Sequence, residues 1–194
     1  EQLSKEDRAE YEKVIVRIDK ICKKAFELKV PVFIDAEDSW IQDAIDRIVD
    51  EMMQRYNQEE VYIYNTIQMY RWDRLDFLKL SHAKAKENSY KLGVKLVRGA
   101  YMEKERARAL EKGYKSPIQE NKEASDKDYD LALAYCVENI EDIALCGGTH
   151  NEKSSLHLAD LIEKNGIAKN DKRIYFAQLL GMSDHISYNL ANAG

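Results

Sequence analysis

The sequence contains few residues that break or cross-link a chain. Its 194 residues include only two prolines, eight glycines and three cysteines, and no stretch rich in glycine and serine marks a linker between domains. Cys22, Cys136 and Cys146 are odd in number, form no C-x-x-C pair and have apolar neighbours. We therefore expect one domain with three buried thiols, in a reducing compartment.

Long apolar runs and a strong net charge are also missing. No stretch approaches the ~18 uncharged apolar residues of a membrane-spanning helix, and the N-terminal EQLSKEDRAEYEK is too acidic for a signal or transit peptide. The net charge of −5 is mild and argues against nucleic acid as a partner. These absences predict a soluble protein.

The sequence does contain five short aliphatic or aromatic runs. They begin roughly 31, 33, 49 and 31 residues apart, close to the ~30 residues or more of a strand with its crossover helix. The runs are VPVFID from Val30, VYIYNTIQ from Val61, VKLVRGAY from Val94, IALCGGTH from Ile143 and IYFAQL from Ile174. Nearly continuous apolar strands are typical of a parallel sheet that is covered by helices, so we predict the α/β class.

The stretches between these runs have helical periodicity. In the first, apolar residues at three- and four-residue spacing predict one buried stripe: Tyr11, Val14, Ile15, Ile18, Ile21 and Cys22. Ser39 and Gln42 match a capping box at the start of the second helix. Asn165-Gly166 predicts the end of the helix that begins after Asn151. The charged MEKERARALEK segment after Tyr101 predicts a helix that returns along the outside of the sheet, with its charges in solvent.

Two parallel architectures fit this alternation. A doubly wound sheet that binds a dinucleotide usually carries G-x-G-x-x-G after its first strand, and this chain has no such motif. We therefore predict a partial (β/α)8 TIM-type barrel with about five of the eight strands. Because five strand–helix units cannot close such a barrel, residues 1–194 are expected to be an internal piece of one barrel domain, without its first strand and its last strand and helix.

Each run ends in polar or unusual residues, and active sites of barrels lie at the C-terminal ends of the strands. These ends are Asp35, Gln68, Arg98–Tyr101, Thr149–Asn151 and Gln178–Leu179. Each has a plainer interpretation as a helix cap, a loop amide, a solvated strand end or a core leucine. Asp35, Glu37 and His150 could also form a metal site, although the chain has no H-x-H or H-E-x-x-H motif.

Four segments, in this order and at these intervals, resemble the proline dehydrogenase family of flavoenzymes, in its monofunctional form. They are FIDAED, KLVRGAYMEKERA, GGTHNEKS and FAQLLGMSD, and the resemblance runs from Val30 to Gly194. It implies a distorted barrel that binds FAD without a Rossmann fold. It also implies a substrate-side lysine on a strand before Glu1, and an arginine pair for the proline carboxylate on a helix after Gly194.

The resemblance assigns roles to particular residues. Asp35 and Lys95 are implied to be catalytic, with Lys95 reaching towards the flavin N5, where a cation stabilises the reduced flavin. Tyr101 and Leu179 are implied to border the substrate pocket. Cofactor contacts are implied for Ala36, Gln68, Lys95, Arg98, Gly99, Ala100, Thr149 and His150.

The implied reaction is oxidation of L-proline to pyrroline-5-carboxylate by hydride transfer to FAD, with electrons passing to a quinone and at most peripheral membrane contact. The implied location is the cytoplasm or the inner-membrane surface in a bacterium, and the mitochondrial matrix in a eukaryote. Alone, the chain is expected to be inactive, to bind FAD weakly or not at all, and to self-associate through edge strands near Val32 and Ile174. The alternatives are a noncatalytic barrel fragment or assembly module, and a metal-dependent TIM-barrel hydrolase.

Overall fold

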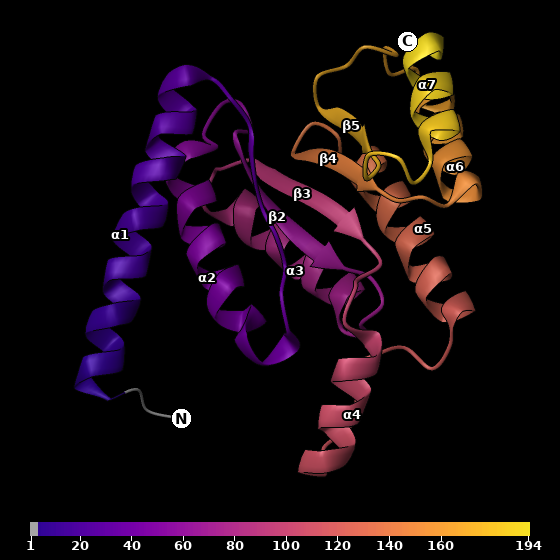
Figure 1. Cartoon of the computed structure of the whole chain (residues 1–194). Helices are drawn as coiled ribbons and strands as arrows, with labels where there is room; N and C mark the ends of the chain where they lie inside the picture. The colour runs from indigo at the N-terminus through magenta and orange to yellow at the C-terminus, as the bar shows by residue number, and fades with distance from the viewer. Residues whose placement is uncertain (1–3) are drawn as a thin grey trace.

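The computed structural model describes residues 4–194, which form seven helices and five strands (Figure 1). In chain order the elements are α1 (Lys5–Leu28), β1 (Val32–Ile34), α2 (Ser39–Tyr56), β2 (Ile63–Gln68), α3 (Arg74–Glu87), β3 (Leu92–Val97), α4 (Met102–Lys112), α5 (Lys122–Glu138), β4 (Ile143–Gly148), α6 (Glu152–Lys164), β5 (Ile174–Ala177) and α7 (Asp184–Ala193). All five predicted strands are present. None of the described helices has the length and apolar composition needed to cross a bilayer.

The five strands form one parallel sheet in the order β1-β2-β3-β4-β5. The register is continuous across the sheet, because Asn65 lies opposite Val94, Val94 opposite Leu145, and Leu145 opposite Ile174. With each strand beside its predecessor in sequence, the sheet is half of a barrel, and the prediction of a partial α/β barrel is confirmed. Because the strands are parallel, their C-terminal ends all lie at the same end of the sheet. The first and last strands, β1 and β5, form its two lateral edges.

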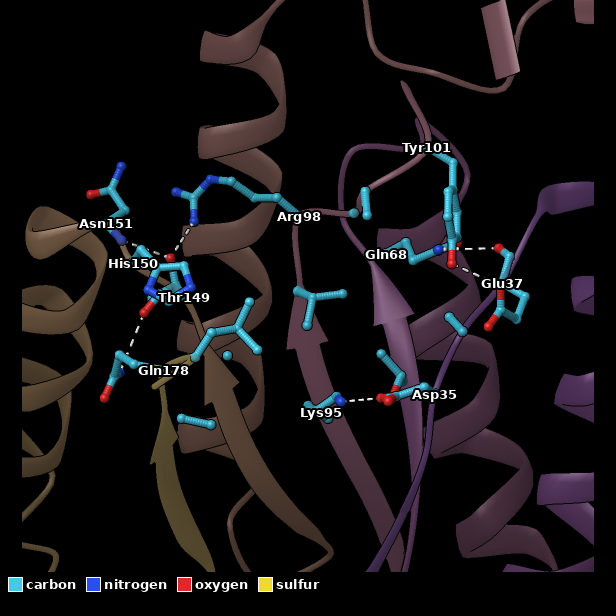
Figure 2. A pocket seen from close by; sticks show the side chains of 18 of the residues that line it. Asp35, Glu37, Gln68, Lys95, Arg98, Tyr101, Thr149, His150, Asn151 and Gln178 are labelled. Atoms are coloured by element: carbon cyan, nitrogen blue, oxygen red, sulfur yellow. Dashed lines mark hydrogen bonds and ion pairs between the residues drawn. The ribbon is translucent and has the colours of Figure 1, made fainter. Parts of the chain in front are cut away.

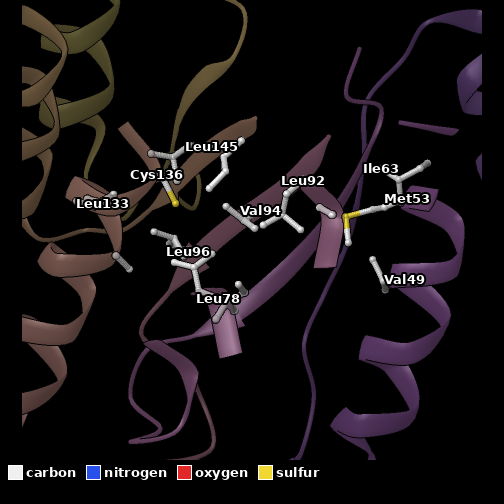
Figure 3. Packing of buried hydrophobic residues seen from close by; sticks show 14 of the residues in the cluster. Val49, Met53, Ile63, Leu78, Leu92, Val94, Leu96, Leu133, Cys136 and Leu145 are labelled. Carbon is white, nitrogen blue, oxygen red and sulfur yellow. The ribbon is translucent and has the colours of Figure 1, made fainter. Parts of the chain in front are cut away.

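The core lies between the sheet and the helices that cover it (Figure 3). At the β2 end of the sheet, Val49 and Met53 of α2 lie near Ile63. Towards β4, on the same face of the sheet, Leu133 and Cys136 of α5 lie near Leu145. Successive side chains of a strand point to opposite faces of the sheet. The strand residues that alternate with those facing the helices therefore face the inside of the half-barrel.

All three cysteines are buried free thiols, as predicted. Burial raises the pKa of Cys22 and of Cys146 to about 11, and it also raises the pKa of Cys136. The thiols therefore stay protonated near neutral pH and are poor nucleophiles.

The stripe predicted on α1 is only partly buried. Cys22 is buried and Tyr11 is half-buried against the core, but the side chains of Val14 and Ile21 are exposed. The helix packs against α2 rather than against the sheet, so a narrower strip of its surface is covered (Figure 1).

The long interval between β3 and β4 contains two helices. α5 is the crossover helix that packs on β3 and β4, whereas α4 extends away from the sheet (Figure 1). The prediction that α4 returns along the outside of the sheet is therefore wrong. Its charged residues are not all in solvent either, because Glu105 is completely buried.

The capping box predicted for α2 is also wrong. The N-cap residue is Asp38, and the Ser39 hydroxyl donates to Glu105 Oε2 (2.6 Å). Gln42 Oε1 accepts instead from the backbone N–H of Glu37 (2.8 Å). The end predicted for α6 is confirmed, since the helix ends at Lys164 and Gly166 follows with φ +64°.

Candidate active site

A cavity of about 750 Å³ lies at the C-terminal strand ends, inside the half-barrel (Figure 2). Residues from all five strand ends line it. Every site residue predicted from the sequence is among them: Asp35, Ala36, Gln68, Lys95, Arg98, Gly99, Ala100, Tyr101, Thr149, His150 and Leu179. The predicted residues therefore lie together at the C-terminal strand ends, as expected for a barrel active site. The roles of the single residues stay predictions.

Asp35 and Lys95 form an ion pair across the inner face of the sheet (Figure 2). Lys95 stands on β3 and Asp35 follows β1, and Thr66 Oγ1 on the strand between them donates to Asp35 Oδ1 (3.3 Å). The Lys95 side chain is 18 % exposed, whereas that of Asp35 is 70 % exposed. Asp35 is not the N-cap of α2, so the plainer interpretation of this residue is excluded.

Arg98 turns towards the helices rather than into solvent. Its guanidinium donates from Nε to Asp126 Oδ1 (2.6 Å), from Nη1 to Thr149 Oγ1 (2.9 Å) and from Nη2 to Ser154 Oγ (3.0 Å). It also lies 4.4 Å from the centre of the Tyr129 ring. Burial raises the pKa of Asp126, but hydrogen bonds from Lys122 and Arg98 outweigh it and leave that pKa below its usual value. Arg98 thus ties β3 to α5 and α6.

Gly99 follows with a backbone that disfavours any side chain. Its φ is +127°, and a Cβ there would lie 2.5 Å from the ring of Tyr70. The Tyr70 N–H donates to the carbonyl of Arg98 (2.8 Å), so this ring is fixed beneath the turn. The glycine is therefore required by packing against Tyr70, and its backbone forms part of the cavity wall.

Gln68 has one hydrogen bond and one free buried acceptor. Its Nε2 donates to the carbonyl of Glu37 (3.1 Å), whereas Oε1 is buried with no hydrogen-bond partner in residues 4–194. A buried acceptor without a donor costs about 1–3 kcal/mol. Gln68 is the last residue of β2 rather than a loop residue, and its contact with a cofactor stays a prediction.

Tyr101 closes the same side of the cavity. Its hydroxyl donates to Glu37 Oε2 (2.8 Å), and this hydrogen bond raises the pKa of Tyr101 (Figure 2). The phenol therefore stays protonated at neutral pH.

The segment after β4 is held in place by its neighbours. The N–H of Asn151 donates to Thr149 Oγ1 (3.0 Å), and Asn151 Oδ1 caps α6 by accepting from the Ser154 N–H (3.2 Å). His150 Nδ1 lies 2.7 Å from Ser183 Oγ, and Gln178 Nε2 donates to the Thr149 carbonyl (3.3 Å). These bonds fix the backbone at the cavity wall.

The structure also bears on two alternative interpretations, the core leucine and the metal site. Leu179 is 66 % exposed, so it is not a core leucine. Asp35, Glu37 and His150 have different partners, and the described residues contain no group of three or more His, Cys, Asp or Glu side chains that could hold a metal ion.

Five further lining residues were not predicted: Thr66, Val97, Lys122, Gly148 and Ala177. The period of two along the strands could have indicated Thr66 from Gln68, and Val97 from Lys95. Lys122 comes from the first turn of α5, and nothing in its local sequence indicates that it reaches the cavity.

Comparisons with known proteins agree with this architecture. A family model described as "Proline dehydrogenase" matches residues 2–194. The chain belongs to the proline dehydrogenase family. "Proline dehydrogenase 1, mitochondrial" from Homo sapiens is 37 % identical over 196 residues, which cover 100 % of this chain and 33 % of the human protein. "Hydroxyproline dehydrogenase" from Xenopus laevis is also 37 % identical, over 99 % of this chain and 42 % of that protein.

The fold is shared with solved structures as well. Proline utilization A from Bdellovibrio bacteriovorus, inactivated by N-propargylglycine, has a TM-score of 0.86 at 24 % identity, over 94 % of this chain and 19 % of that one. This likeness concerns the fold alone. The chain spans about a third of the length of the human and Drosophila melanogaster proline dehydrogenases (33 % and 30 %).

Proposed function

We propose that the cavity is one side of a flavin-dependent active site that oxidises L-proline to pyrroline-5-carboxylate. The single observation that carries this proposal is the convergence of all the predicted site residues on one cavity, in a chain of the proline dehydrogenase family. The five strands form one side of the cavity, and we propose that further strands close it.

The residues present are suited to a flavin. The free Gln68 Oε1 is an acceptor for a ring N–H, and Lys95 is a cation at the edge of the cavity. Gly148 leaves the cavity wall beside Lys95 and Val97 without a side chain. FAD, when bound, would supply the two-electron chemistry by accepting a hydride from C5 of proline.

The chain's own residues would hold and orient these groups. Lys95 would supply positive charge where negative charge develops, and Asp35 would fix the position of its ammonium group. Arg98 and Thr149 would fix the opposite wall. Ala36 and His150 would contact the cofactor, and Tyr101 and Leu179 would border the substrate. Holding donor and acceptor in one geometry is the protein's main contribution to such a transfer.

The partners and the location belong to the same proposal. The electron acceptor would be a quinone, reached by peripheral contact with a membrane. The compartment would be the mitochondrial matrix in a eukaryote and the cytoplasm or inner-membrane surface in a bacterium. The relatives include both proline and hydroxyproline dehydrogenases, so both substrates have to be compared.

The test is anaerobic addition of L-proline to the flavin-loaded protein with its barrel complete. We expect the visible absorbance of the flavin to bleach and pyrroline-5-carboxylate to form in equal amount. Hydroxyproline is added in parallel, and D-proline is the matched control. If the protein holds flavin and neither substrate bleaches it, the proposed function is wrong.

A further inference from the structure

One face of α4 contacts the loop between β1 and α2. The residues of this contact face recur at spacings of three and four, as neighbours on one side of a helix do. They meet four consecutive loop and helix residues in order: Tyr101 meets Glu37, Lys104 meets Asp38, Glu105 meets Ser39 and Arg108 meets Trp40. A helix that leaves the sheet is thereby attached to the segment that follows Asp35.

Glu105 is the buried member of this contact face. It is completely inaccessible to solvent, and its Oε1 and Oε2 accept from the N–H and the hydroxyl of Ser39, both at 2.6 Å. The side chain of Asp38, the N-cap residue of α2, makes no capping hydrogen bond. The carboxylate that caps α2 therefore comes from α4. Its negative charge is favoured by the positive N-terminal end of the α2 dipole.

The loop that Glu105 holds leads directly into the cavity. Glu37 is fixed through its N–H by Gln42 (2.8 Å), through its carbonyl by Gln68 (3.1 Å) and through its carboxylate by Tyr101 (2.8 Å). Asp35 precedes it by two residues and Ser39 follows it by two. A shift of Ser39 would therefore move both the Asp35 carboxylate and the Gln68 amide.

We propose that Glu105 is a positioning residue for the active site. It touches neither substrate nor cofactor, and it acts by fixing the β1–α2 loop, and through the loop Asp35 and Gln68. The inference rests on the proposed function in one respect, since the reaction so supported is taken to be proline oxidation.

The first test needs no substrate. Backbone amide exchange is measured on the flavin-free protein for the parent, Glu105→Ala, Glu105→Gln and the control Glu103→Ala, which changes an exposed acid in the same turn of α4. Glu105→Ala should speed exchange in residues 35–42 by about tenfold or more, because the segment opens locally. Exchange in β4 and α5 should not change, and Glu103→Ala should match the parent.

The second test follows the reaction. In the flavin-loaded protein, Glu105→Ala should slow flavin reduction by proline by about 10- to 100-fold, which is the effect of a small misplacement of reacting groups. The KM for proline should change much less. Glu105→Gln should restore most of the rate, because the amide keeps the size of the side chain and can still pair with Ser39.

The outcomes separate the two proposals. Unchanged exchange in residues 35–42, or exchange that rises equally throughout the sheet, would overturn the role of Glu105. If even the parent protein is not reduced by proline, the proposed function fails and the exchange data still decide the role of Glu105. If Glu105→Ala does not fold, Ser39→Ala replaces it. This variant removes only the hydroxyl bond and should speed exchange in residues 35–42 by a smaller factor, and exchange equal to the parent's would overturn the proposal.

Discussion

Lys95 is the residue whose charge is most closely tied to the proposed chemistry. Its strand position directs the side chain to the inner face of the half-barrel, and its ion pair with Asp35 fixes the ammonium group there. The ring of Phe33 also helps to hold the ammonium group, since its centre lies 5.7 Å from Lys95 Nζ. The lysine stem is mostly buried and its charged end lies at the cavity, so in the proposed function it would stabilise the negative charge of a reduced flavin.

We expect Lys95→Met to make the reduction potential of the bound flavin more negative. Loss of a hydrogen bond to a charged group is worth about 1.5–3 kcal/mol, which for a two-electron couple corresponds to a shift of about 30–65 mV. The potential is measured by dye-coupled titration of the flavin-loaded protein. Lys91→Met is the control, because Lys91 precedes the same strand and pairs with Asp142 near the opposite end. Equal potentials in the two variants would contradict the role of Lys95.

At this scale the sequence predicted the residues at strand ends well. Asp35, Gln68 and His150 could be grouped because the carboxyl ends of parallel strands meet at one edge. Glu105 could not, because an acidic residue in a charged helix usually faces solvent, and only the position of Ser39 in space makes its burial favourable.

Among the helices, α6 links a cap to the cavity wall. Its N-cap Asn151 accepts from the Ser154 N–H, and its own N–H donates to Thr149 Oγ1, which also accepts from Arg98. The start of the helix and the wall of the candidate site therefore depend on the same residue.

Asn151→Ala should lower the free energy of unfolding by about 1 kcal/mol, the usual effect of losing an N-cap side chain. It should also weaken flavin binding severalfold. Without the cap, the start of α6 is held less firmly, and so is the residue-151 N–H that donates to Thr149 Oγ1. Urea unfolding and a flavin titration measure the two effects. Ser4→Ala is the matched control, since Ser4 caps α1 by accepting from the Asp7 N–H. It should lower stability by a similar amount and leave flavin affinity unchanged. Equal flavin affinity in both variants would separate Asn151 from the site.

The elements themselves were predictable where periodicity decides them. The five strands and the end of α6 follow from apolar runs and from Asn165-Gly166. The choice between α4 and α5 as the crossover helix does not follow, because the long interval between β3 and β4 holds two helices and only the structure shows that α5 packs on these strands. The width of the buried stripe on α1 was also predicted too large. The spacing of apolar residues shows which side of a helix is buried, but not how much of that side the neighbouring helix α2 covers.

Over the whole molecule, parallel pairing of consecutive strands leaves two sheet edges, at β1 and β5. The half-barrel was predictable because the spacing of the runs allows one crossover each and the missing glycine motif disfavours the doubly wound alternative. The edges carry unpaired backbone groups, so self-association of the chain stays a prediction.

Acid sensitivity is a second property of the whole molecule. Four carboxyl groups in different regions have a pKa below the usual 3.8: Asp19, Asp126, Asp142 and Asp171. For Asp19 the main cause is a hydrogen bond from Tyr56, and for Asp171 it is one from Arg173. Burial raises the pKa of the other two, but hydrogen bonds from neighbouring cations outweigh it.

A pKa that is lower in the folded than in the unfolded chain stabilises the fold at pH values above the unfolded pKa. This contribution is lost as pH falls through the folded pKa, because the unfolded chain then binds more protons. These groups should therefore cause no loss of stability between about pH 5 and 7, and a fall below about pH 4. Each carboxylate steepens the fall by at most about 1.4 kcal/mol per pH unit. Urea unfolding at a series of pH values measures this slope.

Two substitutions test whether the acid slope has this origin. Asp171→Asn removes the carboxyl group, and Arg173→Gln removes the donor that lowers its pKa. Both should make the slope below about pH 4 shallower, with a loss at neutral pH of less than about 1 kcal/mol, since the pair is partly exposed. Asp171→Asn should flatten the slope more than Arg173→Gln, because the backbone N–H of residue 173 still donates to Asp171 Oδ1 after the arginine side chain is removed. A slope that neither variant changes would mean that other groups govern acid unfolding.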